Sequence, residues 1–303
     1  MKADVNNLNN NDQMYLVIRS LKCGNDKIDY QIKKGDILKI GRVKFAVKLM
    51  QIMGQVEVVN AQQEELEFQE FLELEKDKVI TSVEQIAKMN LSEEDTPKCK
   101  CCWESHATLD DPLFIPCVCK FSHIHLSCLK IWMNSKKSEK DGSGNFKTYY
   151  WKKFMCEVCT TKYPLAIKAD ERNYSTVEYE KPEGNYLVLE SLEQEKNESR
   201  IIHIIKPSDL KDTFKLGRGH EADLRINDIS VSRCHSFIKF KRNKFMLEDN
   251  MSKFGTLVLV KDKVPILPNY NKAMQVGRTV VNFSIKPISS SGRAAESEIK
   301  EAL

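Results

Sequence analysis

Residues 99–128, CKCCWESHATLDDPLFIPCVCKFSHIHLSC, and residues 156–159, CEVC, decide the fold of the middle of this chain. Together they hold eight of the ten cysteines in the 303-residue sequence. Zinc takes four sulfur or nitrogen ligands in a tetrahedron, and closely spaced pairs bring two ligands to one ion. Four such pairs follow in order: Cys99 and Cys102, Cys117 and Cys119, His125 and Cys128, Cys156 and Cys159. Eight ligands serve two ions, so the sequence predicts a small module whose core is two zinc ions rather than hydrocarbon.

The composition excludes several classes of protein. The chain is 41% hydrophobic and 30% charged, which supplies packed cores and argues against a wholly disordered protein. No stretch is apolar over the ~18 residues that a membrane span needs, and the N-terminus lacks a secretory signal. We therefore expect a soluble, intracellular protein of the cytoplasm or nucleus, where a reducing environment favours metal ligation over disulfides. The net charge of +4 is too small to indicate a nucleic-acid or membrane partner.

Three stretches around the ligands, PCVC (116–119), HLSCLKIW (125–132) and CEVC (156–159), resemble the RING-CH (RINGv) zinc finger of a class of ubiquitin ligases. The resemblance implies cross-braced ligation. One ion would take Cys99, Cys102, His125 and Cys128, and the other would take Cys117, Cys119, Cys156 and Cys159. A plant-homeodomain finger is the alternative, because it shares the ligand order and has an aromatic residue where Phe154 stands.

A finger of this class has no catalytic residue of its own, and its zincs are closed and structural. The resemblance implies that it docks a ubiquitin-conjugating enzyme charged with ubiquitin, through a surface that includes Cys101, Trp132 and Val158. Trp132 is alternatively a core aromatic. Two features depart from the family: Thr160 stands where many active fingers carry a basic residue, and the second zinc loop is short. Residues 129–155 carry a net charge of +5 and include SKKSEKDGSGN (135–145). This stretch is interpreted as a basic Gly/Ser loop, which either contacts an acidic partner or is a tolerated insertion.

Residues 185–287 alternate short apolar runs with Gly, Asn, Asp and Pro, which predicts an antiparallel β-sandwich. The stretch FKLGRGHEADLRINDISVSRCHSFIKF (214–240) and SKFGT (252–256) resemble the core of a forkhead-associated (FHA) domain. The resemblance implies binding of a phosphothreonine-containing protein by Arg218 and Ser232, with Arg233 and Lys253 adding positive charge. His235 would brace the loop. Phe254 replaces an asparagine that the family uses to bind the peptide backbone.

The remaining segments complete a mostly β, multi-domain organisation. Residues 13–60 are β-rich, and two stretches there echo the C-terminal sandwich: YLVIRSL (15–21) resembles YLVLESL (186–192), and LKIGRVKFAVKL (38–49) resembles MQVGRTVVNFSI (274–285). The segment is therefore either a partial FHA-like unit or a chance similarity. An acidic linker or helix (61–97), the finger (98–165), the FHA domain (185–287) and a disordered tail (288–303) follow.

Two classes of function fit these modules. The first is a RING-type ubiquitin ligase that uses the FHA domain to bind phosphorylated partners. The alternative is a non-enzymatic scaffold or adaptor, stapled by zinc, with the FHA domain as a docking surface. A histone reader is a third and weaker interpretation.

Overall fold

The computed structural model describes residues 13–20, 22–23, 26–27, 29–54, 97–120, 122–142, 144–169, 172–192, 199–266 and 270–285. The predicted C-terminal tail, and all of the predicted acidic linker except Pro97, lie outside the described residues. The mostly β fold is confirmed: among the described residues, α3 (Leu126–Ser135) is the one α-helix. No helix in the described part of the chain is long and apolar enough to cross a bilayer.

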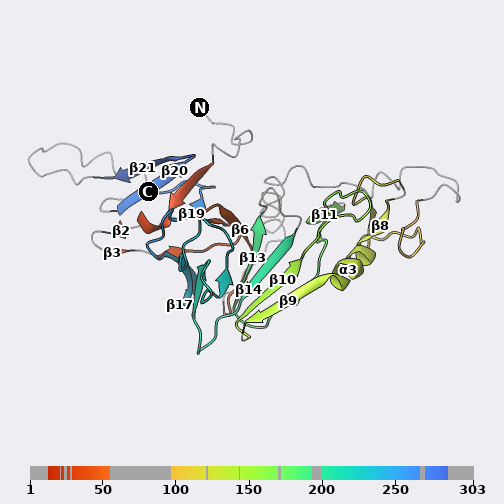
Figure 1. The fold of residues 1–303 in the computed structure, drawn as a ribbon, viewed down its shortest axis with the longest axis horizontal. Helices are drawn as coiled ribbons and strands as arrows, with labels where there is room; N and C mark the ends of the chain where they lie inside the picture. The colour runs from red at the N-terminus through yellow and green to blue at the C-terminus, as the bar shows by residue number, and fades with distance from the viewer. Residues whose placement is uncertain are drawn as a thin grey trace, which may run out of the picture.

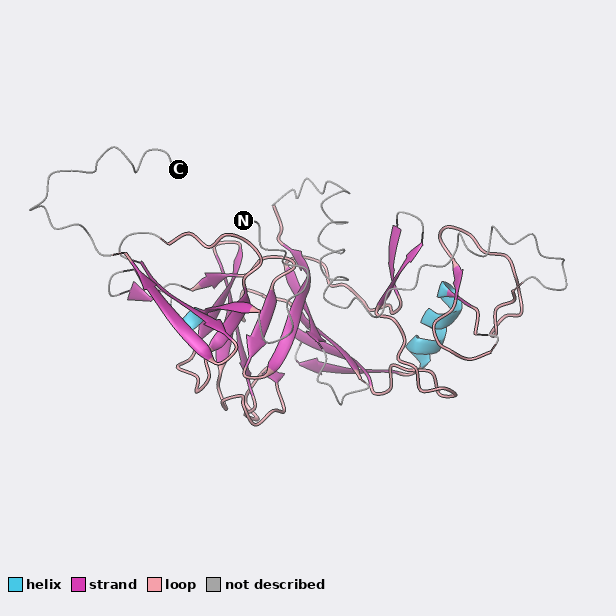
Figure 2. Cartoon of the chain, turned by 90° about the horizontal axis from the view of Figure 1, so that it is seen from above, coloured by secondary structure: helices cyan, strands magenta, loops and turns pink. Residues whose placement is uncertain are grey.

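Two sheets form a sandwich at one end of the molecule, and α3 and the cysteine-rich loops lie at the other end (Figures 1 and 2). The larger sheet has twelve strands. They are β1 (Met14–Val17), β2 (Lys22–Cys23), β3 (Asp26–Lys27), β5 (Ile37–Ile40), β6 (Val43–Gln51), β9 (Lys137–Gly142), β10 (Phe146–Trp151), β13 (Tyr186–Leu192), β14 (Arg200–Ile205), β19 (Thr256–Leu259), β20 (Tyr270–Val276) and β21 (Thr279–Ser284). The smaller sheet consists of β4 (Tyr30–Gln31), β15 (Thr213–Gly217), β16 (Leu224–Arg225), β17 (Ser236–Lys241) and β18 (Lys244–Asp249).

The N-terminal strands and the C-terminal strands belong to the same sandwich. β1 and β5 both pair with β19, and β6 pairs with β13 over seven residues. β4 completes the smaller sheet beside β18. The two β-rich segments therefore meet in one fold, and everything between Gln51 and Tyr186, which face each other across β6 and β13, is an insertion between two neighbouring strands.

The sandwich core lies between the two sheets and is made of aliphatic and aromatic side chains. β6 contributes Phe45 and Val47, and the smaller sheet contributes Phe214, Ile238 and Phe245. Each of these side chains is almost fully buried. Burial of a large apolar side chain contributes about 1.5–3 kcal/mol, so this core is a main source of the stability of the sandwich.

β13 is buried on both faces, because the inserted finger packs on the outer side of the larger sheet. Leu187 and Leu189 point into the sandwich core. Tyr186 and Val188 point the other way, into a second core that also contains finger residues such as Leu129 of α3. Successive side chains of a strand alternate between faces, so one strand forms a wall of both cores.

The stretch 135–145 differs from the Gly/Ser loop expected from the sequence, because it contains a strand. After α3 ends at Ser135, the chain forms the hairpin β9–β10. β10 pairs with β14 over six residues, so the hairpin extends the sandwich sheet. β9, with the sequence KSEKDG, is the outermost strand, and its charged side chains protect that edge from further pairing. The hairpin also binds the finger, because Trp151 Nε1 donates a hydrogen bond to the Met133 carbonyl at 3.0 Å.

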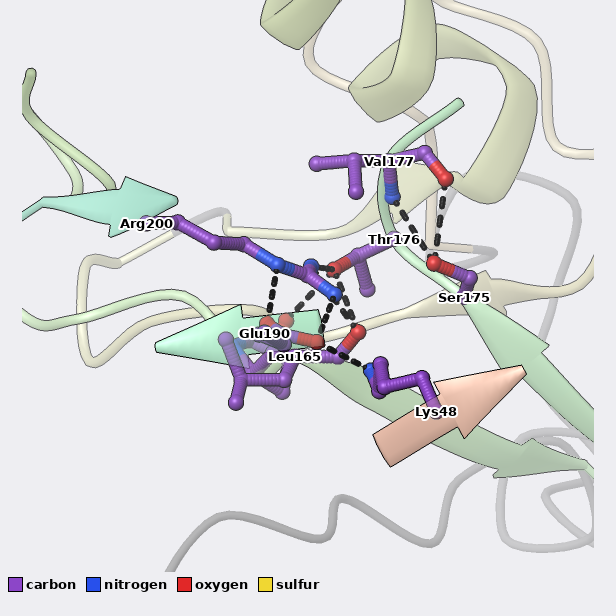
Figure 3. Close-up of polar contacts among 8 residues, drawn as sticks. Lys48, Leu165, Ser175, Thr176, Val177, Glu190 and Arg200 are labelled. Carbon is purple, nitrogen blue, oxygen red and sulfur yellow. Dashed lines mark hydrogen bonds and ion pairs between the residues drawn. The ribbon is translucent and has the colours of Figure 1, made fainter. Parts of the chain in front are cut away.

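A buried group of charges lies where the finger meets the sandwich (Figure 3). Glu190 of β13 accepts a hydrogen bond from Arg200 Nε at 2.7 Å and also pairs with Lys48 of β6. Burial alone would raise the pKa of the Glu190 carboxyl, but Arg200 and Lys48 together hold it below its ordinary value. Arg200 also donates to the carbonyl of Leu165 and to the hydroxyl of Thr176, and so ties the sheet to the segment that leaves the finger.

Two short hairpins complete the finger and the segment that follows it. They are β7 (Leu113–Phe114) with β8 (Ile124–His125), and β11 (Ala166–Ala169) with β12 (Arg172–Ser175).

Candidate metal centres and candidate phosphate site

The finger brings the eight predicted ligands into two groups of four. Cys99, Cys102, His125 and Cys128 form one group, and Cys117, Cys119, Cys156 and Cys159 form the other. Within each group the ligand atoms lie within 4.8 Å of one another. These are the two sets that cross-bracing implies, since each set takes its ligands from alternating pairs along the chain.

The two C-x-x-C turns have the same backbone geometry. The amide of Trp103 donates to the Cys99 carbonyl, and the amide of Thr160 donates to the Cys156 carbonyl, both at 2.9 Å. The residue after each turn is left-handed, with φ of 64° at Trp103 and 58° at Thr160. This backbone conformation is unfavourable for residues other than glycine, and especially for a β-branched threonine. The turns are therefore held by what they surround, as expected of metal-binding loops.

His125 is oriented as a metal ligand through Nδ1. Its Nδ1 lies 3.2 Å from Cys102 Sγ, and its Nε2 donates to the His106 carbonyl at 2.8 Å. A second hydrogen bond of this kind fixes the imidazole tautomer and leaves the other nitrogen free for the metal. The His106 carbonyl was not singled out by sequence reasoning, because a backbone atom contributes no residue-type signal.

The spacing of the sulfurs fits a tetrahedral ion. Cys119 Sγ and Cys156 Sγ are 3.8 Å apart. Two sulfurs bound to one zinc at ~2.3 Å with tetrahedral angles are separated by about 3.8 Å. The donor sets, four sulfurs in one group and three sulfurs with one imidazole in the other, are those that zinc takes in structural sites. Both groups could therefore hold zinc.

Because the thiols in each ligand group are close together, it costs free energy to ionise them all without a cation. Burial, with neighbouring thiols, raises the pKa of Cys128 to about 12. Burial acts in the same direction on Cys99, but amide donors from Cys102, His125 and Cys101 outweigh it and lower its pKa to about 6. A divalent cation stabilises all of the thiolates together, because it is the largest charge in such a site.

The three predicted docking residues all lie at the surface of the finger. Cys101 is exposed, Trp132 is 41% exposed and Val158 is 84% exposed. α3 buries Leu126, Leu129 and Met133 on its inner face, so Trp132 projects from the helix instead of filling the core. Lys136 lies over the Trp132 ring, with its Nζ 4.1 Å from the ring centroid. It also pairs with Glu157 of the second C-x-x-C turn, Cys156–Cys159, which we call the second knuckle. This link places Trp132 beside the Glu157-Val158 tip, and the contribution of Lys136 was missed from the sequence.

The predicted phosphate-binding residues come from three loops that are bound to one another. The Arg218 amide donates to the Ser232 carbonyl at 3.1 Å. The Lys253 amide donates to the Ser232 hydroxyl at 3.2 Å, so that hydroxyl keeps its own proton for a ligand. A Cβ on Gly217 would lie 2.1 Å from the Arg233 carbonyl, so only glycine permits this approach. Arg218, Ser232, Arg233 and Lys253 are thus neighbours at one end of the sandwich.

His235 braces these loops from below, as the FHA resemblance implies. Its Nδ1 accepts from the Ser232 amide at 3.1 Å, and its Nε2 donates to the Gly255 carbonyl at 3.2 Å. Burial lowers the pKa of His235, which keeps the ring neutral and able to make both bonds. Phe254, in the position where the family uses asparagine, is 53% exposed at the rim.

One further cation lies at this site. Arg19, from the 3₁₀ turn Ile18–Ser20 after β1, donates from its guanidinium to the Ser252 carbonyl at 3.1 Å. The two residues are 233 positions apart in the chain. No local pattern in the sequence could have indicated this contact, because only the fold brings the two residues together.

The comparison with family models identifies the C-terminal part of the chain. An FHA domain model matches residues 214–278. No curated protein and no solved structure matches the chain. The match begins at β15 and ends in the turn after β20, and it includes all of the predicted phosphate loops. Residues 214–278 are therefore an FHA domain, and the structure shows that its sandwich is completed by strands from the N-terminal segment and from 186–205.

Proposed function

We propose that this protein is a RING-CH-type ubiquitin ligase whose finger holds two zinc ions and docks a charged ubiquitin-conjugating enzyme, while its FHA domain binds phosphothreonine in partner proteins. The observation that carries the proposal is the pair of interleaved four-ligand groups beside an exposed apolar surface. The ions would hold the zinc loops and α3 in place, and the chain's own side chains would make the contacts.

The exposed surface supports a docking role. Trp132 and Val158 project from α3 and the second knuckle, and Val118 of the second ligand pair is also 80% exposed. Large apolar side chains that gather at the surface of a small module mark protein-binding sites. The Lys136–Glu157 pair links the C-terminal end of α3 to the loop Cys156–Cys159, and so brings Trp132 and Val158 to the same part of the finger.

The phosphate loops and the start of the insertion that carries the finger lie at opposite ends of β6, which suits recruitment. The Gly41-Arg42 turn at one end of β6 contacts the loop before Ser232, since the Arg42 amide donates to Ser230 Oγ at 2.8 Å. The insertion that carries the finger starts after the other end of β6. A nine-residue strand is about 30 Å long, which would give a phosphopeptide and a conjugating enzyme separate sites.

A ubiquitin-transfer assay with the full chain tests the proposal. The chain is mixed with a panel of conjugating enzymes charged with ubiquitin, and thioester discharge and self-ubiquitination are followed. We expect discharge with at least one enzyme, and loss of it in Trp132→Ala. Ile131→Ala is the matched control, because Ile131 is an exposed neighbour on α3 that is not one of the three predicted docking residues.

A non-enzymatic scaffold is the second candidate, and one observation favours it. The finger is fixed to the sandwich by the β10–β14 pairing and by Arg200, which is a rigidity that an assembly subunit would use. Zinc-loaded protein that discharges no conjugating enzyme, yet still binds a phosphothreonine peptide in an Arg218-dependent manner, would support the scaffold and refute the ligase.

A further inference from the structure

The N-terminal segment places a cation beside the phosphate loops. β1 pairs with β19, and Val17 faces Leu257 in that pairing. β19 begins directly after the loop that contains Lys253, so the residues that follow β1 must lie near this loop. Ile18 is fully buried and anchors the turn. The position of Arg19 therefore follows from the strand order of the sandwich.

The contact between Arg19 and the loop is close. Its guanidinium donates to the Ser252 carbonyl at 3.1 Å. Gly255 has φ of 79°, and a Cβ there would lie 3.9 Å from Arg19 Nε. Arg19 thus lies along the Ser252–Gly255 backbone, whose Lys253 amide binds the Ser232 hydroxyl on the other side.

The site holds four cations against one nearby carboxylate, Glu221, whose Oε2 would lie 2.6 Å from a Cβ on Gly219. This balance exceeds the positive charge that one phosphate requires. Arg19, Arg218, Arg233 and Lys253 are all exposed, and in the described part of the chain no carboxylate pairs with any of them. A phosphorylated residue carries about −1.5 to −2 charges at neutral pH. A guanidinium has five N–H donors, and Arg19 uses one at Ser252, so a planar fork remains for a second anionic group.

We propose that Arg19 binds a second anionic group of the peptide, an acidic or phosphorylated side chain near the phosphothreonine. This inference rests on the proposed phosphothreonine site and narrows its ligand class. The ligand is then a peptide with an acidic or phosphorylated residue near its phosphothreonine. It is bound by a turn from the N-terminal segment together with the loops of the FHA domain.

Peptide binding to the full-length protein tests the inference by fluorescence anisotropy. The parent peptide carries phosphothreonine in an uncharged Ala/Gly/Ser background, and six variants each carry one aspartate between positions −3 and +3. We expect at least one aspartate peptide to bind about fivefold tighter than the parent, the size of a single well-placed ion pair. Arg19→Gln should remove that gain, so that this variant binds the aspartate peptide and the parent peptide with equal affinity.

Arg42→Gln is the matched control. Arg42 is another exposed arginine of the N-terminal segment, but it already pairs with Asp228. The aspartate gain should survive in this variant. The inference is overturned if no aspartate peptide gains affinity, or if Arg19→Gln weakens all peptides equally, since a residue that only positions the loop would act uniformly. Failure of the phosphothreonine site itself has a different signature: the wild-type chain would not distinguish the parent peptide from its unphosphorylated form.

Discussion

The finger and the sandwich lie side by side and share a strand, yet they are held together by different means. The sandwich has strands of up to nine residues around a core of aliphatic and aromatic side chains. The finger has one helix and a hairpin of two-residue strands, and its buried residues include ligand cysteines such as Cys99 and Cys156. A module with so little regular structure is expected to depend on metal bound by these cysteines, whereas a sandwich core is not.

Substitution of one metal ligand should produce the largest difference in stability between the finger and the sandwich. Cys102→Ser removes a ligand of the first group, and structural zinc contributes about 10–16 kcal/mol to the folding of small modules. We expect loss of bound zinc and of hydrogen-exchange protection over α3, while β15–β18 stay protected. Metal analysis and hydrogen-exchange mass spectrometry measure the two effects.

Cys101→Ser is the control for this experiment. Cys101 is the neighbouring residue and is exposed, but it belongs to neither group. It should retain both ions. If Cys102→Ser kept two zinc ions and full protection of α3, the finger would not depend on metal, and the contrast between the regions would be lost.

The second largest loss of stability is expected at the seam, the buried group Glu190, Arg200 and Lys48 where the finger meets the sandwich. Glu190→Gln removes the carboxylate that neutralises Arg200 and Lys48 in a fully buried setting. Breaking a buried ion pair by removing one partner costs about 3–5 kcal/mol. Chemical denaturation should show this loss, whereas the same substitution at Glu139, whose pair with Lys147 is exposed, should cost less than about 1 kcal/mol. Equal effects at the two sites would show that the seam contributes no more than the surface does.

A histidine in the sandwich core predicts an acid sensitivity that does not involve the metal sites. His203 lies between Phe45 and Phe146, with the hydroxyls of Thr148 and Ser191 as its polar neighbours. Burial lowers its pKa to about 4. The unfolded chain, with an ordinary histidine pKa of about 6.5, then binds more protons between pH 6.5 and 4, so stability falls as the pH falls through this window.

The loss over that window should approach about 3 kcal/mol, and His203→Gln should remove it. The quantity to measure is the difference between the wild-type and variant free energies of unfolding at several pH values. Two parallel curves from pH 7 to pH 4 would contradict the prediction. Because His235 titrates in the same direction, the difference between the curves isolates His203.

Local patterns in the sequence predicted the ligand pairs, the short strands and the FHA loops, because each depends on neighbouring residues. They could not predict that β6 would pair with β13, or that Arg19 would reach Ser252, because long-range pairing leaves no periodic signal. The hairpin β9–β10 was interpreted as a loop for a related reason. KSEKDG is an edge strand, and its charges hide the alternation of buried and exposed residues on which strand prediction relies.

The smallest loss of stability is expected for a substitution in the second of two matching hairpins of the sandwich. β5–β6 and β20–β21 both turn through Gly-Arg, and their registers correspond, with Leu38 facing Phe45 and Met274 facing Val281. Phe45 is buried in the sandwich core, but Val281 is 45% exposed. Val281→Ala should therefore cost less than about 0.5 kcal/mol, whereas Phe45→Ala should cost about 3–5 kcal/mol. Denaturation of the two variants measures the difference. A large loss at Val281 would mean that the exposed hairpin is covered in solution, and that the sandwich core extends beyond the strands that now enclose it.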